Sequence, residues 1–197
     1  MTDAELVALS QQGDSQAFNR LARKWHAGLY HFVHRTLGNA EEAQDVCQEA
    51  LLKAYLNIRR LRDPGKFRAW LHHIALNLCR DWHRAARARP TGPSIDDVRP
   101  ADLVPAAGAA TGTERRAERN DLLAMVHEAL ESLSLEQRTA ILLREYQGFA
   151  SQEIAEITGV PAATVRTRIF YGLKSVRRML DERGIHPGLL GEGGPQQ

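Results

Sequence analysis

The basic side chains of residues 159–172, GVPAATVRTRIFYG, are spaced for contact with a polyanion. Arg166 and Arg168 have no acidic neighbour in this stretch, although the segment before it is crowded with glutamates. Small residues at the start of the expected helix let its backbone approach the edges of bases, and arginine side chains reach bases or phosphates. A helix without acids also avoids repulsion by phosphates. The stretch therefore favours nucleic-acid binding.

Residues 151–180, SQEIAEITGVPAATVRTRIFYGLKSVRRML, predict a helix, a tight turn and a longer helix. Ala155 is small where two helices would cross, Gly159 suits a turn with positive φ, and Val165 would pack the second helix on the first, which is the pattern of a helix-turn-helix. The expected core side of the second helix holds Val165, Ile169, Leu173, Val176 and Leu180. The opposite side and its flanks hold the candidate contacts to duplex DNA, which are Ala163, Thr164, Arg166, Thr167, Arg168, Tyr171, Lys174 and Arg178. A helical hairpin with a merely solvated basic face is the alternative.

A second group of candidates surrounds the aromatic-rich stretch FRAWLHHIALNLCRDWHR, residues 67–84, which follows a basic loop, RRLRDPGKF. Aromatic rings beside cations suit single-stranded nucleic acid, because the rings stack on unpaired bases while the cations contact phosphates. The candidate residues are Arg62, Lys66, Arg68, Trp70, His73, Asn77, Arg80, Arg84 and Arg87. For Trp70, a place in the helical core is the alternative.

The first 89 residues, which must position this second group, predict a bundle of helices. Thr2 and Glu5 have the spacing of a capping box, in which two side chains satisfy the free amides of a helix start. Apolar residues recur every three or four positions, as on one buried helix face. A helix is expected from about 40 to 61, and the proline and glycine of residues 63–65 must interrupt it before the next helix.

The composition changes after this bundle to prolines, glycines and alanines without a helical period, which predicts a flexible linker. Helical patterns return after it. The predicted fold is all-α, with two small helical domains, a bundle and a helix-turn-helix, on a tether. The expected boundaries are 1–89 for the first domain, 90–115 for the linker, 116–183 for the second domain and 184–197 for a disordered tail.

Positive charge is concentrated in two places, although the net charge is only +2. Residues 1–89 hold 14 basic and 9 acidic groups. Residues 157–183 hold 6 basic and 2 acidic groups, whereas residues 114–156 hold 5 and 9. This distribution suggests two separate contacts with a polyanion.

The composition also excludes several classes of protein. No apolar run approaches the ~18 residues that span a bilayer, and the N-terminus has acids where a signal peptide has basic residues, so we expect a cytoplasmic protein without membrane insertion. Cys47 and Cys79 lack a C-x-x-C partner, which argues against a disulfide framework or a zinc finger. A metal site joining them to His72, His73 or His83 stays open, but its spacing fits no familiar pattern. We predict buried thiols, no metal and no cofactor.

The motifs together resemble a bacterial RNA polymerase sigma factor of the extracytoplasmic-function group, in the sigma-70 family. AQDVCQEALLKAY, residues 43–55, resembles the region 2 helix that grips the clamp helices of the polymerase large subunit. The helix that melts and reads the minus-ten element is matched by Phe67, Trp70, Leu71, Ile74, Ala75, Asn77, Asp81 and Arg84. Residues 133–180 resemble region 4, which reads the minus-thirty-five element. One departure is Gly172, which weakens the middle of its helix by about 1 kcal/mol relative to alanine.

The resemblance implies a protein without catalytic residues that binds core RNA polymerase, at the clamp helices and the flap, and directs promoter-specific initiation. Promoter DNA would be bound as duplex by residues 162–180 and in melted form by the first domain, and an anti-sigma factor is an expected partner. The residues implied in polymerase binding are Asp45, Gln48, Glu49, Leu52 and Lys53.

Two other classes of protein are alternatives to a sigma factor. A helix-turn-helix regulator that never joins polymerase would use the same C-terminal helix and bind duplex DNA alone. An enzyme built on His72, His73 and Asp81 is the other class, but the chain has no glycine-rich phosphate loop, paired carboxylates or nucleophile motif to support it.

Overall fold

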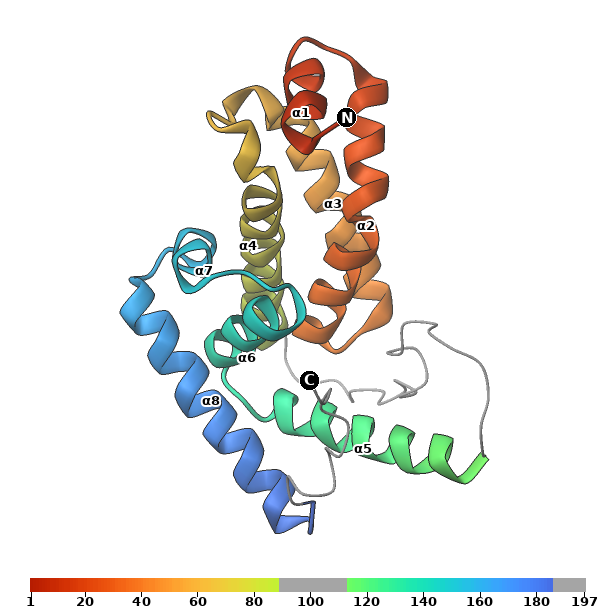
Figure 1. Ribbon diagram of the computed structural model, residues 1–197, viewed down its shortest axis with the longest axis vertical. Coiled ribbons are helices and arrows are strands. Elements are labelled where there is room, and N and C mark those ends of the chain that lie inside the picture. Colours follow the sequence, from red (N-terminus) through yellow and green to blue (C-terminus); the bar gives the residue numbers. More distant parts are fainter. Residues whose placement is uncertain (89–112, 186–197) are drawn as a thin grey trace, which may run out of the picture. The chain divides into compact units, whose positions relative to one another are not determined.

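The computed structural model describes residues 1–88 and 113–185, and for residues 113–121 only the helical backbone. The predicted linker as far as residue 112 and the predicted tail from residue 186 lie outside the described residues. Every regular element in the described ranges is a helix, which confirms the all-α prediction (Figure 1). The α-helices are α1 (Asp3–Gln11), α2 (Ser15–Leu37), α3 (Ala40–Asn57), α4 (Phe67–Ala88), α5 (Thr113–Glu131), α6 (Leu135–Ile141), α7 (Ser151–Thr158) and α8 (Ala162–Glu182). Within these ranges none of the helices has the length and apolar character needed to cross a bilayer.

The N-terminal helix starts as its sequence predicts. The amide of Thr2 donates to Glu5 Oε2 at 2.9 Å and the amide of Glu5 donates to Thr2 Oγ1 at 3.3 Å, so the predicted capping box is formed. Trp25 Nε1 on α2 then donates to Asp3 Oδ2 on α1 at 3.0 Å. A polar bond therefore fixes α1 on α2 beside the apolar contacts of the bundle.

The end of α3 differs from the prediction. The α-helix stops at Asn57 and continues as a short 3-10 turn, Ile58–Arg60, instead of running to residue 61. The reason is a side chain from another helix, since Gln11 Nε2 donates to the carbonyls of Ile58 at 3.0 Å and Leu61 at 2.8 Å. The interruption at 63–65 is as predicted, and a second 3-10 turn, Pro64–Lys66, leads directly into α4.

The described residues divide into two compact units, with breaks between residues 141 and 142 and between residues 166 and 167. The first unit contains α1 to α4, a π-helical turn (Leu142–Tyr146), α7 and the first turn of α8. In this unit α7 packs on α4, which lies beside α2 and α3 (Figure 1). Its most deeply buried side chains include Leu21, Leu29, Phe32, Phe67, Leu71, Leu76, Phe149, Ile154 and Ile157. Burial of such side chains is worth about 1.5–3 kcal/mol each, so they dominate the stability of the unit.

The second unit contains α5, α6 and the remainder of α8. Gly172 of α8 lies so close to α6 that a Cβ atom there would be 2.7 Å from Ile141 Cδ1. This approach turns Gly172 inward and leaves the next residue, Leu173, 42% exposed. The prediction that Leu173 faces the core is therefore wrong, because the side of α8 that approaches α6 most closely is the one without a side chain. In the same unit, an ion pair connects Glu128 of α5 with Arg183, the residue after α8, and Arg183 Nη1 lies 2.6 Å from Glu128 Oε2.

Candidate nucleic-acid interface

The helix-turn-helix predicted from the sequence is present as α7, a turn and α8. Gly159 closes α7 in the left-handed conformation with φ 75°, and its amide donates to the carbonyl of Ala155 at 2.9 Å. Val165, in the first turn of α8, is fully buried. Both observations agree with the roles predicted for these residues. The turn at Gly159 and the buried Val165 hold the first turn of α8 in place.

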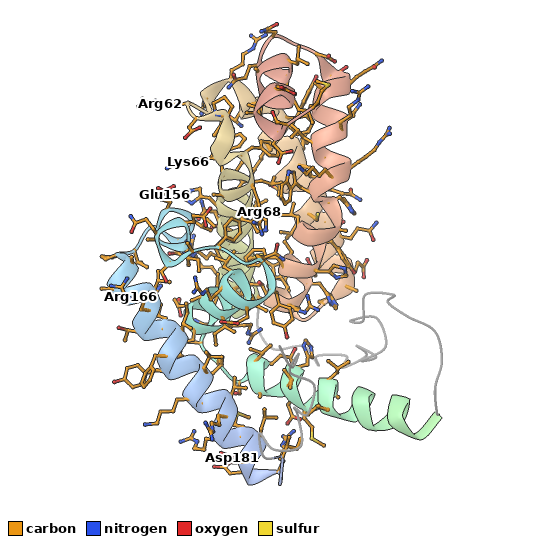
Figure 2. The ribbon with its side chains drawn as sticks, viewed as in Figure 1. Arg62, Lys66, Arg68, Glu156, Arg166 and Asp181 are labelled. Carbon is orange, nitrogen blue, oxygen red and sulfur yellow. The ribbon has the colours of Figure 1, made fainter. Side chains whose placement is uncertain are left out.

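The candidate duplex contacts lie along the outer side of α8. Those exposed to solvent are Ala163, Arg166, Thr167, Tyr171, Lys174 and Arg178, and those half-buried are Thr164 and Arg168. Arg178 Nε lies 3.8 Å from Glu182 Oε1, one turn further along the helix. An exposed pair at this distance binds weakly, so Arg178 keeps most of its freedom to contact another anion. Arg166 is labelled in Figure 2 near the start of the helix.

One exposed residue on α8 was missed. Phe170 is 64% exposed and its ring makes an edge contact with Tyr171 at 5.3 Å between centroids. Large apolar side chains are costly to leave in water, and a contiguous exposed group of them usually marks a binding surface. The signal in the sequence was its position next to Tyr171, opposite the buried side of the helix.

The candidates for melted DNA lie on α4 and the turn before it, in two degrees of exposure. The exposed ones are Arg62, Lys66, Arg84 and Arg87, and the half-buried ones are Arg68, Trp70, His73, Asn77 and Arg80. For Trp70, whose alternative was a place in the core, the structure shows partial burial. Its ring lies 6.3 Å from that of the fully buried Phe67, but the residue is partly exposed. The structure thus brings the predicted residues onto one helix and the segment before it, and it half-buries five of the nine.

Three of the covered residues form a polar chain that ends on α7. His73 Nδ1 lies 2.7 Å from the carbonyl oxygen of Ile157, and because a carbonyl can only accept, Nδ1 is the donor. His73 Nε2 then accepts from Asn77 Nδ2 at 3.0 Å. Asn77 Oδ1 accepts from Arg80 Nη1 at 3.3 Å, and Arg80 Nη2 donates to the carbonyl of Thr158 at 3.1 Å. Each polar group in the chain is matched to a partner of the opposite kind.

Arg68 is held by aromatic rings as well as by a hydrogen bond. Its guanidinium lies 4.1 Å from the centre of the Phe149 ring and 5.2 Å from that of Trp25, and it donates to the carbonyl of Gln147. Burial lowers the pKa of Arg68, an effect that the negative charge of Glu153 opposes. The cation–π contacts and the carbonyl together stabilise a partly buried cation.

Two residues of this group make ion pairs, Arg84 with Asp81 on its own helix and Lys66 with Glu156 on α7. Lys66 Nζ lies 2.8 Å from Glu156 Oε1 and 2.9 Å from Oε2, so a lysine before α4 pairs with a carboxylate on α7 (Figure 2). The hydrogen bond to Glu156, followed by the charge of that carboxylate, raises the pKa of Lys66. Lys66 therefore stays protonated in this position.

His72 is buried beneath this surface and faces the core. Its Nδ1 donates to the carbonyl of Arg68 at 2.8 Å, and its ring lies 5.3 Å from Phe32 and 5.0 Å from Phe149. Burial lowers the pKa of His72 to about 4, so the imidazole is neutral at pH 7. A neutral, enclosed imidazole does not reach a substrate, and the enzyme hypothesis gains no support from it.

The candidates for polymerase binding lie on the outer side of α3. Asp45, Gln48, Glu49, Leu52 and Lys53 are all exposed. Glu49 Oε1 and Lys53 Nζ pair across one turn at 2.9 Å. Two neighbours were missed, since Tyr55 and Leu56 are 42% and 69% exposed beside Leu52 at 57%. Their positions away from the buried side of the helix could have identified them in the sequence. Together with Leu52 they form an exposed apolar patch of the kind that binds another protein.

Both cysteines are free and buried, as predicted. Burial raises the pKa of Cys47 to about 11 and that of Cys79 to about 12, which keeps both as unreactive thiols. Within residues 1–88 and 113–185, no three side chains of the types His, Cys, Asp and Glu are grouped as metal ligands would be.

Comparison with known proteins gives two family matches on this chain. Residues 21–89 match the family described as Sigma-70 region 2, and residues 123–176 match Sigma-70, region 4. The two matches fall in the same order as the two predicted domains.

Similar proteins carry related names. The chain is 34% identical to the RNA polymerase sigma-H factor of Pseudomonas aeruginosa, over 90% of this chain and 93% of that protein. It is 33% identical to the ECF RNA polymerase sigma factor SigM of Mycobacterium tuberculosis, over 91% and 85%. It is also 33% identical to the ECF RNA polymerase sigma-E factor of Escherichia coli, over 89% and 93%.

Two solved structures share the fold. CnrH, in complex with the cytosolic domain of CnrY, superposes with a TM-score of 0.67 at 25% identity and covers 91% of this chain and 97% of CnrH. The sigma factor RpoE, in complex with the anti-sigma factor NepR from Bartonella quintana, gives a TM-score of 0.63 at 20% identity, over 83% and 96%.

Proposed function

This chain belongs to the RNA polymerase sigma factors of the extracytoplasmic-function group, and we propose that it acts as an alternative sigma factor through three separate surfaces. The outer side of α3 binds core RNA polymerase, the outer side of α8 contacts duplex DNA at the minus-thirty-five element, and α4 with the turn before it binds the melted minus-ten element. The chain supplies specificity and strand capture, and we expect no catalytic step of its own.

The observation that carries this proposal is the exposed apolar patch on α3 within the matched Sigma-70 region 2. Leu52, Tyr55 and Leu56 are exposed side chains in the part of α3 that runs from Glu49 to the end of the helix. Exposed apolar side chains that lie together mark a protein-binding surface, which the binding of duplex DNA by α8 does not require. The patch therefore favours a protein that must join a larger assembly.

Duplex reading by α8 is supported by its charge and its shape. Ala163 and Thr164 are small and lie in the first turn, where base edges come closest, and Arg166 follows on the exposed side. Phosphate contacts by arginine and lysine position a helix, and contacts at its N-terminal end read bases. We assign the minus-thirty-five contacts to these residues together with Thr167, Arg168, Tyr171, Lys174 and Arg178.

Melted-strand binding is assigned to α4. Trp70 has a partly exposed ring between cations on either side along the helix, a combination that suits an unpaired base flanked by phosphates. Extruding a base costs a few kcal/mol of stacking, which a ring and cationic contacts can offset. We further propose domain limits of 1–89 and 116–183, an anti-sigma factor as a partner, and a place of action inside the cell.

Run-off transcription with purified core RNA polymerase tests the function. The template is the promoter upstream of this protein's own gene, because many sigma factors of this group drive their own expression. We expect transcripts only when the chain is added, with a start site that defines both promoter elements. A Leu56→Asp variant serves as control and should lose both transcription and co-purification with core enzyme. Binding of promoter duplex by the chain alone, without association with core enzyme, would instead identify a stand-alone regulator.

A further inference from the structure

The segment that joins α3 to α4, residues 58–66, is held by one side chain of α1. Gln11 Nε2 donates to the carbonyl oxygens of Ile58 at 3.0 Å and Leu61 at 2.8 Å. The backbone carbonyl of Gln11 in turn accepts from Arg59 Nε at 3.2 Å. The partners are 47 to 50 positions apart in the chain, so the end of α1 and the start of the joining segment form one polar cluster.

The carboxamide of Gln11 binds the joining segment where the chain turns. The amide of Leu61 donates to the carbonyl of Ile58 at 3.1 Å and closes the 3-10 turn. A carboxamide nitrogen has two N–H groups, and here they reach the carbonyl at the start of this turn and the one just after it. Ile58 and Leu61 are buried, whereas Arg60 between them is exposed. The backbone of the turn is therefore fixed on its inner side, with its cations outside.

The conformation of this turn sets the direction of Arg62, which is exposed and follows Leu61 directly (Figure 2). The carbonyl of Leu61 and the amide of Arg62 belong to one planar peptide group, so the hydrogen bond from Gln11 fixes the plane from which Arg62 starts. The second half of the segment is held locally, since the amide of Gly65 donates to Asp63 Oδ1 at 2.9 Å. Gln11 is thus the long-range anchor of the first half.

We propose that Gln11 is a positioning residue for the melted strand, because its carboxamide fixes the peptide plane that directs Arg62 toward a phosphate. Gln11 contacts no DNA itself and acts through Arg62. It lies before the residues that match Sigma-70 region 2, which begin at residue 21. The proposal rests on the proposed function for the identity of the ligand. A contact that only adds to the stability of the bundle is the alternative.

Substitution by methionine tests this role. Gln11→Met has a side chain of similar length without N–H groups, and it keeps the backbone carbonyl that holds Arg59. Gln12→Met is the matched control, because Gln12 is the next residue and is exposed. The probe is a fluorescein-labelled fragment of the promoter defined by run-off transcription, with its minus-ten region unpaired, titrated with holoenzyme. We expect Gln11→Met to bind about tenfold more weakly than Gln12→Met, since a misdirected cation loses its phosphate contact.

A double-mutant cycle separates positioning from stability. If Gln11 acts through Arg62, Gln11→Met should weaken binding by less than about twofold more in an Arg62→Ala background. A fragment that ends upstream of the minus-ten element should be bound equally by all these holoenzymes, because α8 is unchanged. Additive losses in the cycle, or equal binding of the unpaired fragment by Gln11→Met and Gln12→Met, would overturn the proposal.

A lysine at position 11 should restore the function, because its ammonium group again offers donors to the two carbonyls. Gln12→Lys adds the same charge next to it. We expect the gain in affinity from Met to Lys to be about fivefold larger at position 11 than at position 12. Equal gains would show that added charge alone acts, which contradicts the proposal. If Gln11→Met does not fold, Gln11→Asn takes its place, because its shorter side chain cannot reach both carbonyls.

The anchor can also be measured without DNA. In the free full-length chain, hydrogen exchange followed by mass spectrometry should be faster over residues 58–62 in Gln11→Met than in Gln12→Met, because the turn closed by the Leu61 amide opens more often. Unchanged exchange would overturn the proposal. Faster exchange, together with a parent holoenzyme that does not initiate transcription, would instead refute the proposed function and with it the ligand assigned to Arg62.

Discussion

The outer side of α8 and the α7-facing side of α4 are built from the same kinds of residue, but they are in different states. Arg166 and Lys174 of α8 are exposed, whereas His73, Asn77 and Arg80 of α4 are bonded in a chain that ends on α7. Residue type therefore indicates what a surface can bind, and the neighbouring acceptors determine what it binds in the free chain. For an initiation factor the difference is useful, because duplex is met before melted DNA.

Next to its covered side, α4 also carries a fully buried histidine, His72. His72 lies between Phe32 of α2 and Phe149 of the segment before α7. Its neutral imidazole donates to the carbonyl of Arg68, four residues earlier on the same helix. Changes at His72 should therefore act on the α4 side and leave α8 alone.

The largest expected effect is a loss of stability in acid that depends on His72. Its folded pKa of about 4 lies below the ~6.5 of an unfolded histidine, so between these values the unfolded chain binds the extra proton. The free energy of unfolding should accordingly fall as the pH is lowered from about 6.5 to 4, by roughly 3 kcal/mol from this group. Urea unfolding followed by circular dichroism over this pH range measures it.

Substitution separates His72 from the other titrating groups. His72→Leu keeps an apolar side chain in the pocket and should flatten the pH dependence by that amount, although it removes the hydrogen bond to Arg68. His26→Leu, at an exposed position on α2, is the control and should keep the slope of the parent chain. If His72→Leu and the parent lose stability in parallel, the histidine is not the cause.

The contrast between the two faces also shows which features of the structure could be predicted from the sequence. The helices, the capping box at Thr2 and the turn at Gly159 were predictable because each depends on residues within four positions of one another. The acceptors that hold His73 and Arg80 are backbone carbonyls 84 and 78 positions away, and a backbone carbonyl has no signature in a sequence. The identity of the candidate residues was therefore accessible, but their occupation by α7 was not.

The second prediction assigns the two faces to different steps of initiation. Arg166→Ala should weaken the closed complex of the holoenzyme with duplex promoter and lower its salt slope by about one, as expected for one lost phosphate contact. Trp70→Ala should leave the closed complex intact and reduce strand opening by about 10-fold to 100-fold, since stacking is worth ~1–3 kcal/mol per base. Mobility shift at several salt concentrations measures the first, and permanganate reactivity of unpaired thymines measures the second. Normal opening by Trp70→Ala would remove that residue from the melted-strand site.

The smallest effect concerns the inner side of α8, which determines what its outer side presents. Gly172→Ala should gain about 1 kcal/mol of helix propensity but place a Cβ 2.7 Å from Ile141 Cδ1, and overpacking of a buried contact costs ~1–3 kcal/mol, so a net loss of about 1 kcal/mol is expected. Ile141→Val removes the clashing methyl group, and the double variant should be more stable than the sum of the single effects predicts. Gly28→Ala on α2 is the matched control, because its Cβ would meet nothing closer than 3.6 Å and should be neutral or stabilising in urea unfolding. If Gly172→Ala is as well tolerated as Gly28→Ala, close contact with α6 is not what turns Leu173 to solvent.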